Sequence, residues 1–220
     1  MAVPACLPDG SSGWAFNWNF KPKHKDVYLA QWSILDHAPH LIDDIRQRSL
    51  WRSWWRFVWT HVFIGPAGTV TGLHNDDNPN MFASVRGSKD WILFPPGNDD
   101  ALQPGTKYDY GAQCSIVDIS QLSSMPAHVK ASFQRARGGV FARVEPGDML
   151  YVPPRTWHAV VSPTMPCISL SMFGLQLRHI FVNGIPGLVR YALHCLGLYR
   201  VGHCTCCKNC NAASTKVKGT

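Results

Sequence analysis

The sequence is poor in charged residues and lacks a long uninterrupted apolar run. Only 16% of its 220 residues are charged, a proportion that disfavours long solvated helices. The longest mainly apolar stretch, 180–201, is interrupted by polar, charged, glycine and proline residues, so we predict no transmembrane segment. Met1–Gly13 has neither a basic start nor a continuous apolar segment, and a secretory signal peptide is not expected. We therefore predict an intracellular protein, cytoplasmic or nuclear, with reduced cysteines.

Turn-forming residues are abundant, with 18 glycines and 16 prolines, and 45% of the residues are hydrophobic. The length suits one well-packed core. Short apolar segments alternate with turn signals such as Gly65–Gly68 and Glu145–Asp148. The predicted strands are Tyr28–Gln31, Thr60–Ile64, Leu73–Asp76, Asn80–Arg86, Trp91–Phe94, Val140–Val144, Met149–Val152, Trp157–Val161 and Cys167–Phe173. This pattern predicts a mainly β fold with two sheets packed together, a jelly roll or double-stranded β-helix.

Helical periodicity predicts helices that flank the strands. One helix is expected after an N-cap at Asp36, a second around 127–135, and a C-terminal helical region with a break at Gly184–Pro186. The tryptophans within 51–59 are spaced like the buried face of a further helix. We divide the chain into an irregular lead-in (1–26), a jelly-roll domain (27–175), a C-terminal helical region (176–201) and a Cys-rich basic tail (202–220).

A candidate metal site combines two distant strands. Side chains two apart on a strand face the same way, so His74 and Asp76 share one face and Asp77 lies on the other. His158, at the start of a later strand, supplies a second imidazole. Two imidazoles and one carboxylate leave three coordination positions open, as a non-haem Fe(II) oxygenase needs for 2-oxoglutarate and O₂. An HxD triplet alone, or a histidine after tryptophan alone, is common without a metal, so the combination carries the prediction.

Three segments resemble the iron-binding core of JmjC (cupin-like) hydroxylases. Phe63–Asp76 is similar to the strand with the first two ligands, Asn80–Pro96 to the next hairpin, and Glu145–Phe173 to the segment with the distal histidine. The resemblance covers about 28–173, in the order and spacing of the family. It implies a cupin-type barrel that binds Fe(II), 2-oxoglutarate and O₂, with His74, Asp76 and His158 as metal ligands.

The same resemblance implies roles for residues around the metal. Lys89 would pair with the distal carboxylate of 2-oxoglutarate, a role that suits an ammonium group. Thr71 and Tyr28 match hydroxyl donors of the asparaginyl hydroxylase branch, and Asn80 matches its amide. Ser171 stands where that branch has an asparagine, so a shorter or water-mediated contact is expected there.

As a function, the resemblance implies hydroxylation of a protein side chain (Asn, His, Lys or Arg) with release of succinate and CO₂. Histone demethylation is less favoured, because many JmjC demethylases have Glu as the carboxylate ligand. Two alternatives stay open: a catalytically silent cupin-like binding or scaffold protein, and a tRNA-base hydroxylase. The net charge of +7 is compatible with nucleic acid, although a solvated basic tail explains it more simply. A cupin enzyme acting on sugars or nucleotides would be expected to have more histidines near the first motif.

The C-terminal part leaves further alternatives open. Cys204, Cys206, Cys207 and Cys210 crowd into eight residues with His203, a spacing that strains a tetrahedral zinc site. The apolar region before them is compatible with lying on a membrane surface or a partner. Its helices could also form a homodimer, as they do in some relatives.

Overall fold

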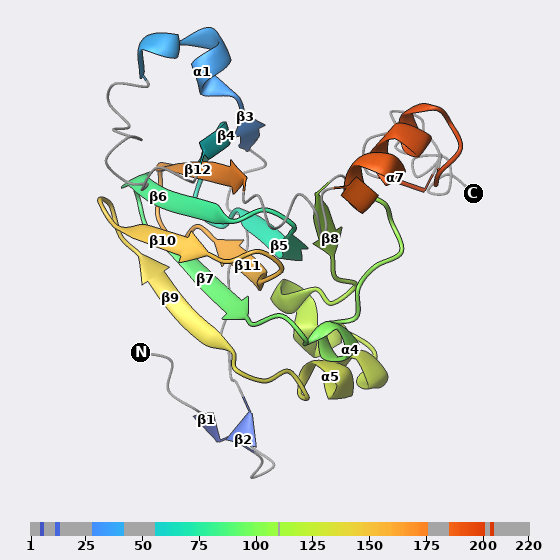
Figure 1. Ribbon diagram of the computed structural model, residues 1–220. Helices are drawn as coiled ribbons and strands as arrows, with labels where there is room; N and C mark the ends of the chain where they lie inside the picture. The colour runs from blue at the N-terminus through green and yellow to red at the C-terminus, as the bar shows by residue number, and fades with distance from the viewer. Residues whose placement is uncertain are drawn as a thin grey trace, which may run out of the picture.

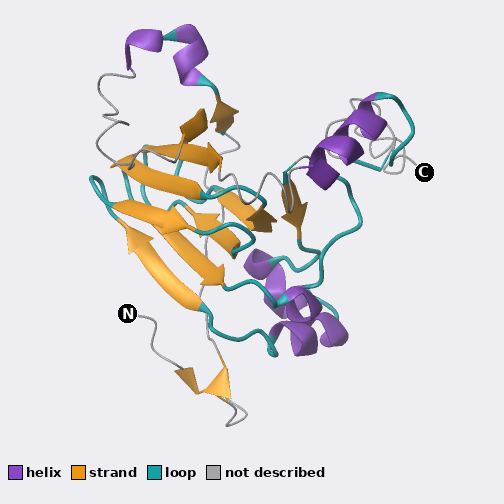
Figure 2. Ribbon diagram, viewed as in Figure 1, coloured by secondary structure: helices purple, strands orange, loops and turns teal. Residues whose placement is uncertain are grey.

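Two antiparallel five-stranded sheets face each other in the computed structural model (Figure 1, Figure 2). The structure describes residues 5–6, 12–13, 28–41, 56–109, 111–175, 185–200 and 203–204. Its strands are β1 (Ala5–Cys6), β2 (Ser12–Gly13), β3 (Leu29–Trp32), β4 (Arg56–Gly65), β5 (Val70–Asp76), β6 (Asn80–Arg86), β7 (Lys89–Phe94), β8 (Ala112–Cys114), β9 (Val140–Val144), β10 (Met149–Val152), β11 (Trp157–Val161) and β12 (Cys167–Leu175).

The strand order confirms the predicted jelly roll. One sheet has the order β10-β6-β12-β4-β3 and the other β8-β5-β11-β7-β9, so consecutive strands repeatedly cross between sheets. Strands β6, β9, β10 and β11 begin and end at the predicted residues. The reason is that each one combines β-branched or aromatic residues with a turn signal on both sides. In the lead-in, β1 and β2 form a two-residue antiparallel pair.

The helices lie at the edges of this barrel (Figure 2). They are α1 (Ile34–His37), the 3-10 helix η1 (Pro39–Leu41), α4 (Asp99–Leu102), the 3-10 helix η2 (Ile119–Ser124), α5 (Ala127–Phe133) and α7 (Ile185–Cys195). The predicted helix around 127–135 is thus confirmed as α5. None of the described helices is long and apolar enough to span a bilayer.

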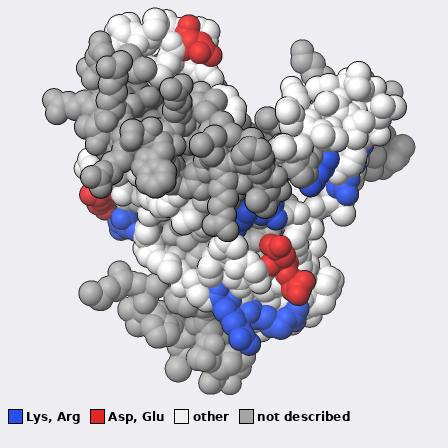
Figure 3. Space-filling model, in the orientation of Figure 1, with Lys and Arg blue, Asp and Glu red and all other residues white. Residues whose placement is uncertain are grey.

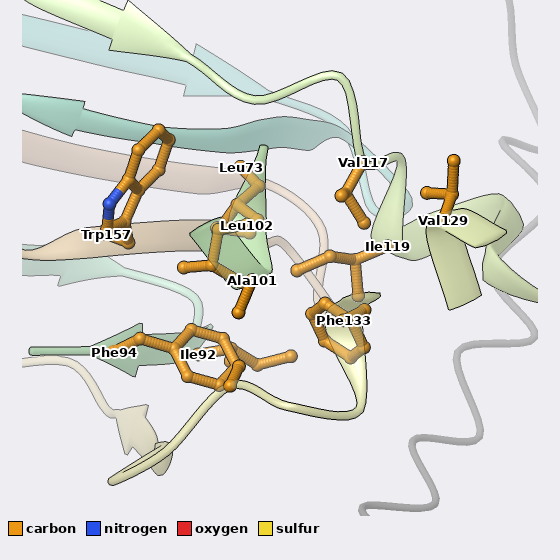
Figure 4. Packing of buried hydrophobic residues seen from close by; sticks show 12 residues of the cluster. Leu73, Ile92, Phe94, Ala101, Leu102, Val117, Ile119, Val129, Phe133 and Trp157 are labelled. Atoms are coloured by element: carbon orange, nitrogen blue, oxygen red, sulfur yellow. The ribbon is translucent and has the colours of Figure 1, made fainter. Parts of the chain in front are cut away.

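A hydrophobic core joins the second sheet to α4 and α5 (Figure 4). Trp157, Ile92 and Leu102 have no exposed surface at all. The indole Nε1 of Trp157 donates a 2.8 Å hydrogen bond to Asp99 at the start of α4. Because a buried indole N–H without a partner would be destabilising, this bond fixes β11 against α4 next to His158.

Two predictions at the N-terminal side are wrong. Asp36 is not an N-cap, because the chain turns one residue after β3 and Ser33 occupies that position, with the Asp36 amide donating to the Ser33 carbonyl at 3.2 Å. Trp59 does not lie on a helix but in β4, where it is 40% exposed. Its neighbours are β-branched and aromatic, and their period-two alternation outweighs the spacing of the tryptophans. Trp51, Trp54 and Trp55 lie outside the described residues.

In the C-terminal part, α7 stands beside β8, the edge strand of the second sheet (Figure 1). Cys204 is buried and forms an isolated bridge with Tyr108, whereas the other tail cysteines lie outside the described residues. The boundaries predicted at 26, 175 and 201 stay predictions.

Candidate active site

His74, Asp76 and His158 converge at one point on the inner face of the second sheet. Their ligand atoms all lie within 4.8 Å of one another. The Asp76 carboxylate stands between the imidazoles, with its oxygens 3.9 Å from Nε2 of His74 and 3.7 Å from Nε2 of His158. Because β5 and β11 pair with His74 opposite His158, the strand register itself creates this arrangement.

The Asp77 side chain points away from His74 and His158, as the alternation of side chains along the strand predicts. Its carboxylate accepts a 3.0 Å hydrogen bond from the Arg155 guanidinium. Neither Asp77 nor Arg155 lines the cavity that contains the three converging residues. The structure therefore offers Asp76, and not Asp77, as the carboxylate of the site.

Both histidines are oriented for metal binding by backbone carbonyls. Nδ1 of His74 lies 2.8 Å from the Gly72 carbonyl, and Nδ1 of His158 lies 2.9 Å from the Thr156 carbonyl. A carbonyl can only accept, so each Nδ1 carries a proton and each Nε2 is the nitrogen that faces Asp76. This arrangement is typical of metal-ligating histidines. Two imidazoles and one carboxylate fit Fe(II) by the chemistry of the donor set.

Burial shapes the protonation of this group. Burial, and then the neighbouring His74, hold the pKa of His158 well below its ordinary value of 6.5, so this imidazole stays neutral. Burial raises the pKa of Asp76 although His74 opposes the shift. A cation at the convergence point would favour the ionised carboxylate and use the neutral imidazole of His158 as it stands.

Lys89 is a buried cation on the wall of the same cavity. It is 3% exposed, and burial lowers its pKa. Its Nζ donates a 2.7 Å hydrogen bond to Ser162, whose Oγ lies 2.7 Å from Thr69 Oγ1, and Thr69 reaches the Pro66 carbonyl at 3.1 Å. Among the described residues, no carboxylate forms an ion pair with Lys89. A buried ammonium held by neutral groups is a strong site for an anion.

The other residues predicted for co-substrate binding line this cavity too, which has a volume of about 540 Å³. Burial raises the pKa of Tyr28, while a hydrogen bond with Thr71 opposes the shift. The Asn80 amide donates to Ser171 at 3.3 Å, and its Oδ1 is a buried oxygen without a partner. The structure thus brings all eight predicted site residues to one cavity, of a size usual for small ligands.

Several residues in or next to the cavity were not predicted. Ser162, which accepts the hydrogen bond from Lys89, follows the last residue of β11 and lies four residues beyond His158, so period-two alternation could have identified it. Trp91 stacks on the His158 ring at 5.4 Å, and its Nε1 is buried without a partner. Cys114 comes from the three-residue strand β8, which pairs with β5 opposite His74. No sequence pattern indicated so short a strand.

A jelly roll with two histidines and a carboxylate near a buried lysine defines a cupin-type metal-site protein. A family model described as "Cupin-like domain" matches residues 17–180. Because this match covers more than half of the chain, the protein belongs to the cupin-like domain family.

Individual relatives match shorter parts of longer proteins. The chain is 34% identical over 154 residues to Lysine-specific demethylase JMJ30 of Arabidopsis thaliana, covering 63% of this chain and 32% of that protein. It is 27% identical over 171 residues to 2-oxoglutarate and iron-dependent oxygenase JMJD4 of Mus musculus, covering 72% and 37%. An X-ray structure of E. coli ycfD superimposes with a TM-score of 0.48 at 16% identity, covering 83% of this chain and 43% of that one. The chain spans about one third of the two curated relatives.

Proposed function

We propose that this protein is an Fe(II)- and 2-oxoglutarate-dependent dioxygenase that hydroxylates a protein side chain. One observation carries the proposal: a His-Asp-His group with ligand atoms within 4.8 Å shares a cavity with a buried lysine that lacks a carboxylate partner among the described residues. A metal site alone fits many cupins. A metal site beside a buried, unpaired cation fits a metal-chelating co-substrate with a second, distal anionic group.

Each site residue has a role in this proposal. Nε2 of His74, Nε2 of His158 and the Asp76 carboxylate hold the iron, which together with bound 2-oxoglutarate and O₂ supplies the oxidation of a C–H bond to an alcohol, with succinate and CO₂ released. Lys89 binds the distal carboxylate of 2-oxoglutarate, and the hydroxyls of Thr71 and Tyr28 donate to it. Asn80 and Ser171 orient the co-substrate from the opposite sheet.

The side chain that is hydroxylated would be Asn, His, Lys or Arg. Asp109 and Asp118 line the same cavity as the triad. Carboxylates there favour a basic target, Lys or Arg, and disfavour the phosphates of a tRNA. One relative is named as a demethylase and another as an oxygenase, and demethylation would begin with hydroxylation of a methyl group. We also propose an intracellular location, because Cys114, Cys167 and Cys195 are free thiols.

Succinate formation tests the proposed activity. Purified protein with Fe(II), ascorbate and 2-oxoglutarate should produce succinate slowly without substrate, and His74→Ala should produce none because one metal ligand is lost. Direct titration of 2-oxoglutarate in the presence of Mn²⁺ gives a second measurement that does not need turnover. If wild type neither turns over nor binds 2-oxoglutarate, the dioxygenase proposal is wrong and a cupin-like binding protein remains.

Ser162 is expected to position Lys89 for the co-substrate. Ser162→Ala should raise the dissociation constant of 2-oxoglutarate about tenfold, or about 1.4 kcal/mol, because the ammonium loses the acceptor that fixes it. Titration calorimetry with Mn²⁺ measures this change. Ser132→Ala is the matched control, since that serine is equally buried but bonds to the Asp100 carbonyl in the helical layer. If the two variants bind 2-oxoglutarate with equal affinity, Ser162 does not position Lys89 for the co-substrate.

A further inference from the structure

The acidic residues of the chain all precede residue 149. From 149 to 220 there is no Asp or Glu, while seven basic residues account for the whole formal net charge of +7. These residues are Arg155, Arg178, Arg190, Arg200, Lys208, Lys216 and Lys218. Residues 1–148 are therefore balanced in charge, and residues 149–220, which include the last three strands of the barrel and α7, are basic.

Helix α7 lies within this basic part and has one apolar face. Ile185, Leu188 and Val189 fall on the same side of the helix and are 51%, 59% and 51% exposed. Leu196 and Leu198 follow directly and are 72% and 74% exposed. Figure 3 shows this end of the molecule as a mainly white knob that projects from the barrel, with basic side chains beneath it.

The opposite side of α7, and the residues that follow it, contact the segment before β8. His194 is buried, and its ring lies 4.8 Å from that of Tyr108. Arg200 donates to the Thr106 carbonyl, and the Tyr108 amide donates to the His203 carbonyl at 3.0 Å. His194 lies on the side of the helix opposite Ile185 and Val189, and because it is buried the apolar side faces outward.

We propose that α7, together with the basic residues that precede and follow it in the sequence, binds an anionic membrane surface. An amphipathic helix with exposed leucine, isoleucine and valine inserts these side chains among lipid tails, while nearby Arg and Lys attract anionic headgroups. The exposed residues Arg190 and Arg200 lie on or beside α7, and further basic residues follow at positions 208, 216 and 218.

Two other occupants of this face fit less well. A symmetric dimer would place the same basic segment of each copy together, with no acidic residue after 148 to neutralise it. A nucleic acid would match the charge but would leave the leucine and isoleucine side chains exposed, because its surface is phosphate. Only a surface that is both apolar and anionic satisfies both features of this region.

Vesicle cosedimentation with the full chain tests the proposal. Wild type should bind vesicles of phosphatidylcholine mixed with phosphatidylserine, bind phosphatidylcholine alone much less, and dissociate as salt is raised. The double variant Leu188→Ser, Val189→Ser should bind at least about tenfold more weakly. Val140→Ser is the matched control, since Val140 is 57% exposed on β9, far from α7 in sequence, and its binding should equal that of wild type. Arg190→Gln should reduce binding to the mixed vesicles about fivefold.

Three results would each contradict the proposed membrane binding. Equal vesicle binding by wild type and the serine variant would overturn the proposal. So would a wild-type dimer in light scattering that the serine variant converts to monomer without any vesicle binding, because the face would then be covered by a second copy. Binding to an RNA duplex in the absence of vesicle binding would assign the basic region to nucleic acid. Since no arm requires turnover, these results do not depend on the oxygenase activity.

Discussion

Asp76→Asn is expected to abolish succinate formation, whereas Asp77→Asn is expected to retain it. The two carboxylates are neighbours in sequence, but only Asp76 lies between the two Nε2 atoms, while Asp77 pairs with Arg155. Loss of an outer-shell partner already weakens metal binding about 10–100-fold, so loss of the only carboxylate ligand should weaken it by at least about 100-fold.

Titration with Mn²⁺ or Co²⁺ measures this difference without turnover. The pH dependence gives a second readout, because metal binding requires an ionised Asp76. Burial raises the pKa of Asp76 above its ordinary value of 3.8, so metal affinity should fall on acidification at a higher pH than an exposed aspartate would give. His158 does not limit loading, because its lowered pKa keeps it neutral. Similar metal affinities in the two Asn variants would contradict the assigned ligand set.

Lys89→Met is expected to separate stability from binding. The ammonium is 3% exposed and lacks a carboxylate partner among the described residues, so replacing it by an apolar side chain of similar length should raise the free energy of unfolding of the ligand-free protein by about 1–2 kcal/mol. The same change should raise the dissociation constant of 2-oxoglutarate at least about 100-fold, because a charge-assisted contact to its distal carboxylate is lost.

Denaturant unfolding and calorimetric titration measure the two effects. Burial places the folded-state pKa of Lys89 below its ordinary value of 10.5, so between these values the unfolded chain binds more protons and wild-type stability should rise with pH. The difference between wild type and Lys89→Met should therefore shrink as pH rises through that interval. A variant that is less stable and still binds 2-oxoglutarate normally would show that Lys89 serves the fold and not the co-substrate.

The sequence predicted most of the barrel because its strands carry strong local signals. Alternation of period two placed His74 and Asp76 on one face and separated Asp77 from them. The second ligand strand was found because His158 follows a turn-rich segment and begins an apolar strand. Co-substrate residues such as Lys89 needed the family resemblance, since nothing local distinguishes a cavity lysine from one in an ordinary turn.

The remainder depended on tertiary contacts. The hydrogen bond between Ser162 and Thr69 joins residues 93 positions apart. No local pattern indicates which serine accepts the hydrogen bond from Lys89. Strand β8 is held by pairing with β5 and not by its own propensity. At Trp59 a local pattern was misleading. The spacing of the tryptophans predicted a helix, but this residue lies in strand β4.

The pairing of His74 with His158 restricts where residues can be inserted or deleted without loss of the metal site. One inserted residue within β5 or β11 would turn every following side chain to the opposite face of its sheet. Such an insertion would leave a barrel of nearly normal composition without a ligand set, whereas a longer turn between β9 and β10 would leave the ligands in place. Insertions and deletions among natural variants that keep the activity should therefore fall outside these two strands.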